Sequence, residues 1–262
     1  TKAAIVTTLF LSLGAQADTI LNVATAGDQN MVDYVKTWLG PKFEAAHPGV
    51  KVRVIGTGPG DAGSNKISEK LTAQQESGAQ QWDIDVAVVH QKAGGEQVAK
   101  GLLQKYRQDI QTGGMVSSPS ATQALGVNVD GYVMPMFLSQ TAIAWNSDLV
   151  TTPPASYDEL VAWTQKHPQA FGYNGIKNGM SGVSFVVGWI YAYGTDAQCL
   201  SAGPYDKSVE KGWQQAYEKL KAFNKNVTFT PGNAGALDML SRGEIAMGPV
   251  WVDMFYSWKD QG

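Results

Sequence analysis

The alternation of apolar and polar positions predicts strands and helices in turn along the first hundred residues. Runs of β-branched residues with a two-residue period predict strands at Thr19–Thr25, Val50–Ile55 and Asp83–Val89. Apolar residues spaced three and four apart predict helices at Met31–Phe43 and Ser64–Ser77, and Gly94–Tyr106 is interpreted as a short helix and its exit. The first helix is expected to stop at His47-Pro48-Gly49, and Gly40-Pro41 is expected to kink it.

The second half of the chain begins after a polar, irregular stretch at Arg107–Gly131, which is interpreted as a connector. Two extended runs are expected within Tyr132–Asn146. Ser156 and Glu159 have the spacing of a capping box, so a helix should begin there. Three more helices are predicted, at Gly182–Gly194, Asp206–Asn226 and Ala234–Glu244.

This order of elements predicts an α/β protein with mainly parallel sheets and helices on both faces. Ligands of such sheets bind beyond the carboxyl ends of the strands. In this chain those ends are Ala26–Gln29, Gly56–Gly63 and His90–Gly95. The three loops are therefore the first candidates for a binding site.

Composition narrows the class of protein. The 262 residues are 44% hydrophobic and carry a net charge of −3, so the chain offers no basic field for nucleic acid. Residues 1–17 read as part of a secretory signal peptide: Lys2 precedes an apolar run from Ala3 to Leu13, and Ala15-Gln16-Ala17 resembles a cleavage site. The rival interpretation is an N-terminal core helix. Secretion is expected, with the mature protein starting at Asp18.

Motifs for covalent or metal chemistry are weak. The single cysteine, Cys199, is interpreted as a free structural thiol, and His47 and His167 each precede a proline at a helix end. Gly58–Gly63 matches G-x-G-x-x-G, but the acidic residues downstream stand at the start of the next strand rather than at its end. A glycine loop at a ligand mouth is preferred to a dinucleotide site. No metal and no cofactor are expected.

One stretch near the end, Gly248–Phe255 ("GPVWVDMF"), raises a specific question. If it is extended, Trp251 and Asp253 point to the same side, because side chains two apart in a strand share a face. A flat indole beside a carboxylate can hold a sugar. The alternative is a buried tryptophan followed by a helix-capping aspartate.

Taken in order, several stretches resemble the extracellular solute-binding proteins of ABC importers, in the branch that includes maltose-binding protein. These stretches are Phe43–Ile55, Trp82–Gln104, Met134–Val150, Pro153–Trp163 and Ala236–Trp251. The resemblance implies a two-lobe periplasmic-binding-protein fold of type II. It implies lobe 1 at 18–136 and lobe 2 at 137–262, with the segments that return to lobe 1 missing from a truncated C-terminus.

The resemblance also implies that loops of both lobes converge on a cleft, with Trp251 as its aromatic floor. The sequence departs from maltose-binding protein at Val88–Gln91, where that protein carries an aromatic residue, so its ligand is not transferred. The expected ligand-binding residues are Asp28, Gln29, Gly60, Asp61, His90, Gln91, Ser139, Gln140, Met180, Ser181, Trp251 and Asp253.

The function that follows is capture of a small polar solute in the periplasm and its delivery to the transmembrane subunits of an ABC permease. A monomer is expected. A carbohydrate or polyol is the first choice of solute, and a cation such as a polyamine or thiamine, ringed by Asp28, Asp61 and Asp253, is the second. A secreted carbohydrate-active enzyme is the alternative from another class, although no pair of carboxylates is singled out for it.

Overall fold

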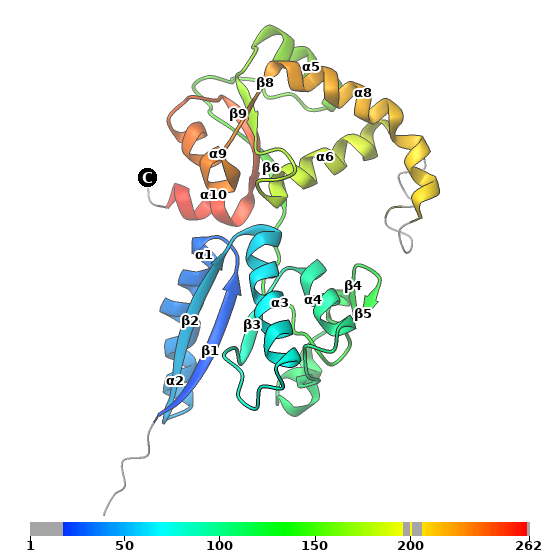
Figure 1. The fold of residues 1–262 in the computed structure, drawn as a ribbon. Coiled ribbons are helices and arrows are strands. Elements are labelled where there is room, and N and C mark those ends of the chain that lie inside the picture. Colours follow the sequence, from blue (N-terminus) through cyan, green and yellow to red (C-terminus); the bar gives the residue numbers. More distant parts are fainter. Residues whose placement is uncertain (1–17, 196–199, 201–205, 261–262) are drawn as a thin grey trace, which may run out of the picture.

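A computed structural model describes residues 18–195, 200 and 206–260 and places them in two α/β lobes, one above the other in Figure 1. The predicted signal peptide and Cys199 lie outside the described residues. Lobe 1 is defined here as the part built on the sheet β2-β1-β3, and lobe 2 as the part built on the sheet β6-β9-β7-β8. The predicted boundary at 136/137 stays a prediction. No helix in the described part of the chain is both long and apolar enough to cross a membrane.

Lobe 1 follows the predicted β-α-β order. Its parallel sheet consists of β1 (Thr19–Ala26), β2 (Val50–Gly58) and β3 (Val86–Val88). β1 is the central strand, and its last four residues, Val23 to Ala26, are buried because strands flank it on both sides. The helical elements are α1 (Gln29–Asp33), the π-helical turn η1 (Tyr34–Leu39), α2 (Gly40–Ala46), α3 (Gly60–Glu76) and α4 (Gln91–Ala99).

Several expectations for lobe 1 need correction. The third strand is shorter than Asp83–Val89, and α3 begins four residues before Ser64, so most of the glycine stretch is the first turn of a helix. A Cβ on Gly63 would lie 1.8 Å from the carbonyl oxygen of Gly58, so glycine is required by close packing of that turn on the strand end. The expected kink at Gly40-Pro41 is instead a widened turn that comes just before it.

The predicted connector contains more structure than the sequence indicated. It holds three short 3₁₀ turns, η2 (Arg107–Asp109), η3 (Gly113–Met115) and η4 (Pro119–Ala121), and a hairpin of β4 (Gln123–Ala124) and β5 (Val127–Asn128). Both turn residues of the hairpin, Leu125 and Gly126, have positive φ, as a two-residue hairpin turn requires. Leucine rarely adopts this conformation, which is why the pattern gave no hairpin signal.

Lobe 2 carries a mixed, mainly parallel sheet. β7 (Phe171–Tyr173) pairs parallel with β8 (Val227–Phe229) and with β9 (Met247–Trp251), while β6 (Thr141–Trp145) runs antiparallel to β9. Only one of the two extended runs expected within Tyr132–Asn146 is therefore a strand. The helical elements are α5 (Tyr157–Lys166), α6 (Met180–Tyr193), η5 (Lys207–Trp213), α8 (Gln214–Phe223), η6 (Asn224–Asn226), α9 (Gly232–Ser241) and α10 (Val252–Lys259).

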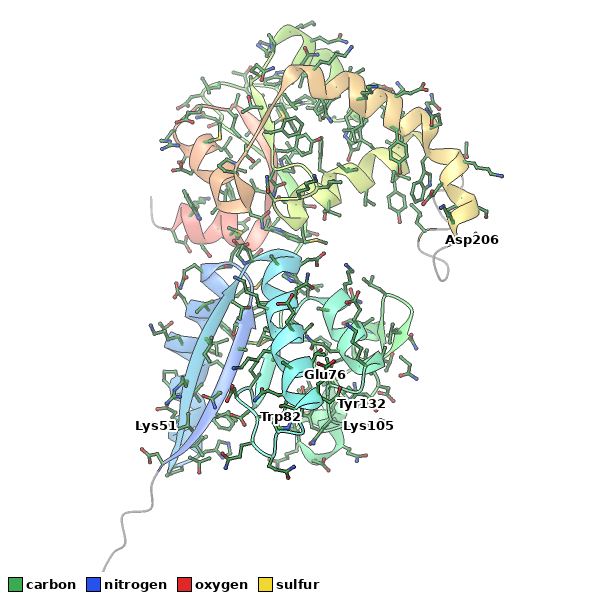
Figure 2. The ribbon with its side chains drawn as sticks, in the orientation of Figure 1. Lys51, Glu76, Trp82, Lys105, Tyr132 and Asp206 are labelled. Carbon is green, nitrogen blue, oxygen red and sulfur yellow. The ribbon has the colours of Figure 1, made fainter. Side chains whose placement is uncertain are left out.

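The helix starts and stops of lobe 2 follow the sequence signals closely. The Ser156 hydroxyl accepts from the backbone N–H of Glu159 at 3.2 Å, while the Glu159 carboxylate accepts from the N–H of Ala155, one residue earlier than in the standard box. His167 is the C-cap of α5, as its position before Pro168 predicted. The long helix expected from Asp206 begins as 3₁₀ turns, and Asp206 caps them at the outer end of the lobe (Figure 2).

Each lobe has its own buried core. The largest cluster in lobe 2 surrounds Trp189, Phe171 and Phe223, and a second joins Leu237 and Ile245 to the base of α10. The lobe 1 cluster lies between β1, α3 and the segment after α4. None of these three clusters mixes residues of the two lobes, so the lobes meet through other contacts.

Candidate functional site

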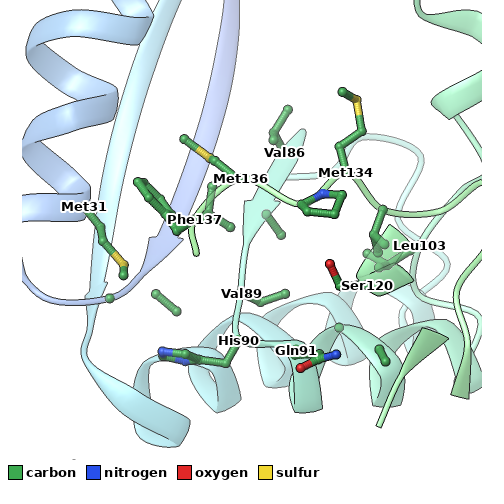
Figure 3. Close-up of a pocket in the computed structure, with 18 of the residues that line it drawn as sticks. Met31, Val86, Val89, His90, Gln91, Leu103, Ser120, Met134, Met136 and Phe137 are labelled. Carbon is green, nitrogen blue, oxygen red and sulfur yellow. The ribbon is translucent and has the colours of Figure 1, made fainter. Parts of the chain in front are cut away.

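A cavity of about 1150 Å³ opens where the lobes meet and continues along lobe 1. Its rim, defined here as the part where the lobes meet, carries polar side chains from both lobes, with the indole of Trp251 beside them: Asp28, Asn30, His90 and Gln91 from lobe 1, and Ser139, Asn233 and Asp253 from the crossing and lobe 2. Its deep wall is apolar and belongs to lobe 1. Figure 3 shows part of that wall, with Met31, Met134, Met136, Phe137 and Val89 around the space and His90 and Gln91 below. Trp82 and Tyr132, which also line it, lie at the end of lobe 1 far from lobe 2 (Figure 2).

Asp28 stands at the carboxyl end of β1, where it is the N-cap residue of α1. Its Oδ2 accepts a hydrogen bond of 3.1 Å from the side-chain amide of Asn233 in lobe 2. Burial raises the pKa of the Asp28 carboxyl above its ordinary value, while the Asn233 donor opposes this shift; Asp253 adds to the shift and His90 opposes it. Asp28 is therefore a partly desolvated acceptor at the boundary between the lobes.

Asp253 occupies a different setting from the one expected for an extended segment. β9 ends at Trp251, and Asp253 lies in the first turn of α10, so the two side chains do not share a strand face. The strand stops here because its partner β6 begins at Thr141, which pairs with Trp251, and the next N–H, of Val252, bonds to the Gln140 carbonyl outside the ladder. Asp253 is not a side-chain cap either.

The Asp253 carboxylate instead joins three parts of the chain. Oδ2 accepts from the amide of Asn30 in lobe 1 at 2.8 Å, and Oδ1 accepts from the hydroxyl of Ser139 in the crossing segment. Trp251, half-buried, lines the cavity beside it. The indole and the carboxylate thus do converge on one cavity, through a strand end and a helix start rather than through strand alternation.

His90 is held by Ser64, a fully buried residue of α3. The Ser64 hydroxyl accepts from the backbone N–H of His90 at 3.3 Å and lies 3.1 Å from its Nδ1. A hydroxyl whose lone pair already takes that N–H can donate its own proton to Nδ1, and the neutral imidazole then carries its proton on Nε2. His90 is thereby fixed at the cavity as an oriented polar group.

The charges around the cavity have one sign. Three carboxylates line it, those of Asp28, Asp85 and Asp253, and among the described residues that line it there is no Lys and no Arg. The Asp85 carboxylate accepts from the backbone and side chain of Asn22. The cavity is suited to groups that donate hydrogen bonds, and an anion would meet no cationic side chain there.

Eight of the twelve expected binding residues line this cavity: Asp28, Gly60, His90, Gln91, Ser139, Met180, Trp251 and Asp253. Four do not. Gln29 donates to Asp33 on the outside of α1, Gln140 contributes its carbonyl to the start of α10, and Ser181 is fully buried beneath Asn233. Asp61 lines a separate cavity of about 240 Å³ between the starts of α3 and α6.

The sequence analysis missed two asparagines, Asn30 and Asn233, whose side-chain hydrogen bonds join the two lobes. Asn30 lies in the predicted helix start and Asn233 follows a Pro-Gly pair at the start of α9, so each reads as an ordinary helix-terminal residue. Only the meeting of the lobes places them opposite carboxylates. The side-chain oxygen of Asn30 is buried without a hydrogen-bond partner, although Asn30 lines the cavity.

No group of three or more His, Cys, Asp or Glu residues within the described part of the chain could hold a metal ion.

A family model described as bacterial extracellular solute-binding protein matches residues 38–262. The chain belongs to this family. The family description is of proteins that bind solutes outside the cell. Comparison with curated proteins finds no match.

Solved structures share the fold at low sequence identity. A maltose-bound MalE3 of T. maritima has a TM-score of 0.67 at 17% identity, covering 89% of this chain and 61% of its own. The spermidine/putrescine transporter protein PotD from Streptococcus pneumoniae has a TM-score of 0.62 at 14% identity, covering 91% and 64%. Iron-bound HitA from Pseudomonas aeruginosa has a TM-score of 0.59 at 14% identity, covering 93% and 66%.

These likenesses confirm the predicted two-lobe binding-protein fold. The family model, with a maltose-bound protein among the structures of the same fold, confirms the predicted resemblance. The chain spans about two thirds or less of the length of the three structures described. Because those proteins are named for a sugar, a polyamine and iron, the shared fold does not select a solute for this one.

Proposed function

We propose that this solute-binding protein is the receptor component of an ABC importer, which captures a small polar solute between its lobes in the periplasm and delivers it to the permease. The observation that carries the proposal is the cavity rim, to which both lobes contribute polar side chains. A solute held by side chains of both lobes favours the closed arrangement, because the solute gains hydrogen bonds from each lobe only when the lobes meet.

A carbohydrate or polyol is the solute class that we propose first. Asp28, Asp253 and Gln91 offer acceptor oxygens for hydroxyl hydrogens, and the half-buried indole of Trp251 offers a flat surface for C–H groups.

A cationic solute is the second candidate, and a specific observation favours it. Among the Asp, Glu, Lys and Arg residues of the described chain, only three aspartates line the cavity. Two of them, Asp28 and Asp253, lie close enough to interact electrostatically, and a bound ammonium group would relieve their repulsion. Asp61 is not part of this pair, since it lines the smaller cavity.

A thermal-shift screen against sugars, polyols, polyamines and organic phosphates tests the proposal, followed by calorimetry on each hit. We expect a sugar or polyol to raise the melting temperature, phosphates to have no effect, and every binding solute to be recovered unchanged. A polyamine as the only hit would replace the first solute class by the second. Product release from a saccharide would overturn the receptor in favour of an enzyme.

A further inference from the structure

Asn233 is a polar residue at the boundary of the lobes. Solute binding alone does not explain why its side chain is held there by several hydrogen bonds. It belongs to the first turn of α9, is 8% exposed, and lines the cavity next to Asp28. Its amide makes three hydrogen bonds, two within lobe 2 and one to lobe 1.

The orientation of this amide is fixed from within lobe 2. Its oxygen accepts from Asn174 Nδ2 and from the Ser181 hydroxyl, both at 2.8 Å. Asn174 is itself oriented, because its Nδ2 also donates to the carbonyl of Asn178. With two donors on its oxygen, Asn233 can present only its NH₂ group to the cavity.

Close packing prevents the amide from turning away. A Cβ on Gly179 would lie 2.4 Å from the Asn233 oxygen and 2.6 Å from Asn174 Nδ2, so the backbone at this glycine lies directly against the network. Gly179 also has a φ of 144°, a conformation that side chains oppose. The hydrogen bonds that hold the donor thus lie entirely within lobe 2 and need no contact with lobe 1.

We propose that Asn233 is a positioning residue that couples lobe closure to the Asp28 carboxylate, so that the closed arrangement is favoured even without solute. When the lobes separate, Asp28 exchanges this fixed N–H donor for water, and Asn233 loses its acceptor. The inference goes beyond the proposed function, because it concerns the solute-free chain and holds for any solute.

The test exchanges the charge across the boundary. Asn233→Asp places a carboxylate opposite Asp28, and we expect the lobes of the solute-free protein to separate. The exchange variant Asp28→Asn/Asn233→Asp should close again, because Asp at 233 still accepts from Asn174 and Ser181 and now accepts from the amide at 28. Asn224→Asp is the matched control: it adds the same charge to lobe 2, where the oxygen accepts from the hydroxyl of Tyr173 in the same lobe.

Closure is measured without solute, by small-angle scattering and by the distance between spin labels at Glu69→Cys in α3 and Lys221→Cys in α8, with Cys199→Ser. We expect longer distances for Asn233→Asp alone, and wild-type distances for the exchange variant and for Asn224→Asp. Wild-type distances for Asn233→Asp, or an exchange variant that stays open, would overturn the proposal.

A second variant covers the case in which Asn233→Asp does not fold. Asp28→Ala removes only the acceptor in lobe 1 and leaves the lobe 2 network intact, so it should open the lobes while each lobe stays folded. An Asp28→Ala protein that remains closed would show that the bond is incidental. None of these measurements uses a solute, so their outcome does not depend on the proposed receptor function.

Discussion

Asn30 and Asp253 lie 223 positions apart in the chain, and the amide of Asn30 donates to Asp253 Oδ2 at 2.8 Å. Together with the bond from Asn233 to Asp28, this makes a reciprocal pair in which each lobe supplies one amide and one carboxylate. The two bonds run in opposite directions across the boundary, so both have to form or break as the lobes move.

Loss of the Asp253 carboxylate should therefore weaken solute binding. Asp253→Ala leaves the Asn30 amide and the Ser139 hydroxyl without their acceptor, and hydrogen bonds to a charged group contribute about 1.5–3 kcal/mol. We expect roughly a tenfold or greater loss of affinity in calorimetry with the solute found by screening. Asp148→Ala, which removes an exposed carboxylate of lobe 2, should bind as the wild type does. Equal affinities of both variants would remove Asp253 from the site.

The indole of Trp251 should matter as an aromatic platform. We expect Trp251→Ala to weaken binding by at least about 1.5 kcal/mol, which is typical of losing a buried aromatic contact. Trp145→Ala is the matched control, because Trp145 lies on the same pair of strands but at the opposite end, where it pairs with Met247. If calorimetry finds the two variants alike, Trp251 is part of the scaffold and not of the site.

The Asp28 carboxyl gives the protein a specific dependence on pH. Because burial raises its pKa above 3.8, the folded protein binds this proton more readily than the unfolded chain does. The contribution of this group to stability is therefore greatest below the unfolded value and decreases as the pH rises through the raised folded value. Asp28→Asn removes that dependence while keeping a group that can accept from Asn233.

Melting temperatures of wild type and Asp28→Asn across pH 4 to 7 check this prediction. The melting temperature of the wild type should drop below that of Asp28→Asn as the pH rises, and the two melting temperatures should approach each other as the pH falls. The groups that face Asp28 are Asn233, Asp253 and His90, and all three are present in both proteins. A difference that is constant with pH would contradict the raised pKa.

Gly182 in the first turn of α6 should tolerate no side chain. A Cβ there would lie 1.7 Å from the carbonyl oxygen of Gly175 and 2.2 Å from Asn174 Oδ1. We expect Gly182→Ala to lower the free energy of unfolding by about 3 kcal/mol or more in urea titrations, since the obstacles include backbone. Gly114→Ala, where a Cβ meets nothing within 4 Å, should change it by less than about 0.5 kcal/mol.

Local signals predicted much of this fold. Alternation identified β1 and β2, and the order of elements gave the parallel sheet and placed Asp28 and His90 at strand ends. These predictions succeed because they depend on periods of two or 3.6 residues, which are written in neighbouring positions. The Ser156 cap and the stop at His167 belong to the same local class.

The missed features depend on residues that meet only in the folded chain. Asp253 is helical because the partner strand begins at Thr141, more than a hundred positions earlier, and nothing in "GPVWVDMF" records that limit. Asn30 and Asn233 become interlobe donors only through the position of the other lobe. The positive φ of Leu125 likewise contradicts its local preference.

The separation of the buried clusters by lobe has a thermodynamic consequence. A large heat capacity change accompanies the exposure of apolar surface. Within residues 18–195 and 206–260, the three apolar clusters each lie inside one lobe, and the hydrogen bonds across the boundary join amides to carboxylates. Separation of the lobes should therefore be accompanied by a small change in heat capacity, whereas unfolding of either lobe should be accompanied by a large one. The free energy of opening should therefore vary almost linearly with temperature, whereas the free energy of unfolding of either lobe should be strongly curved.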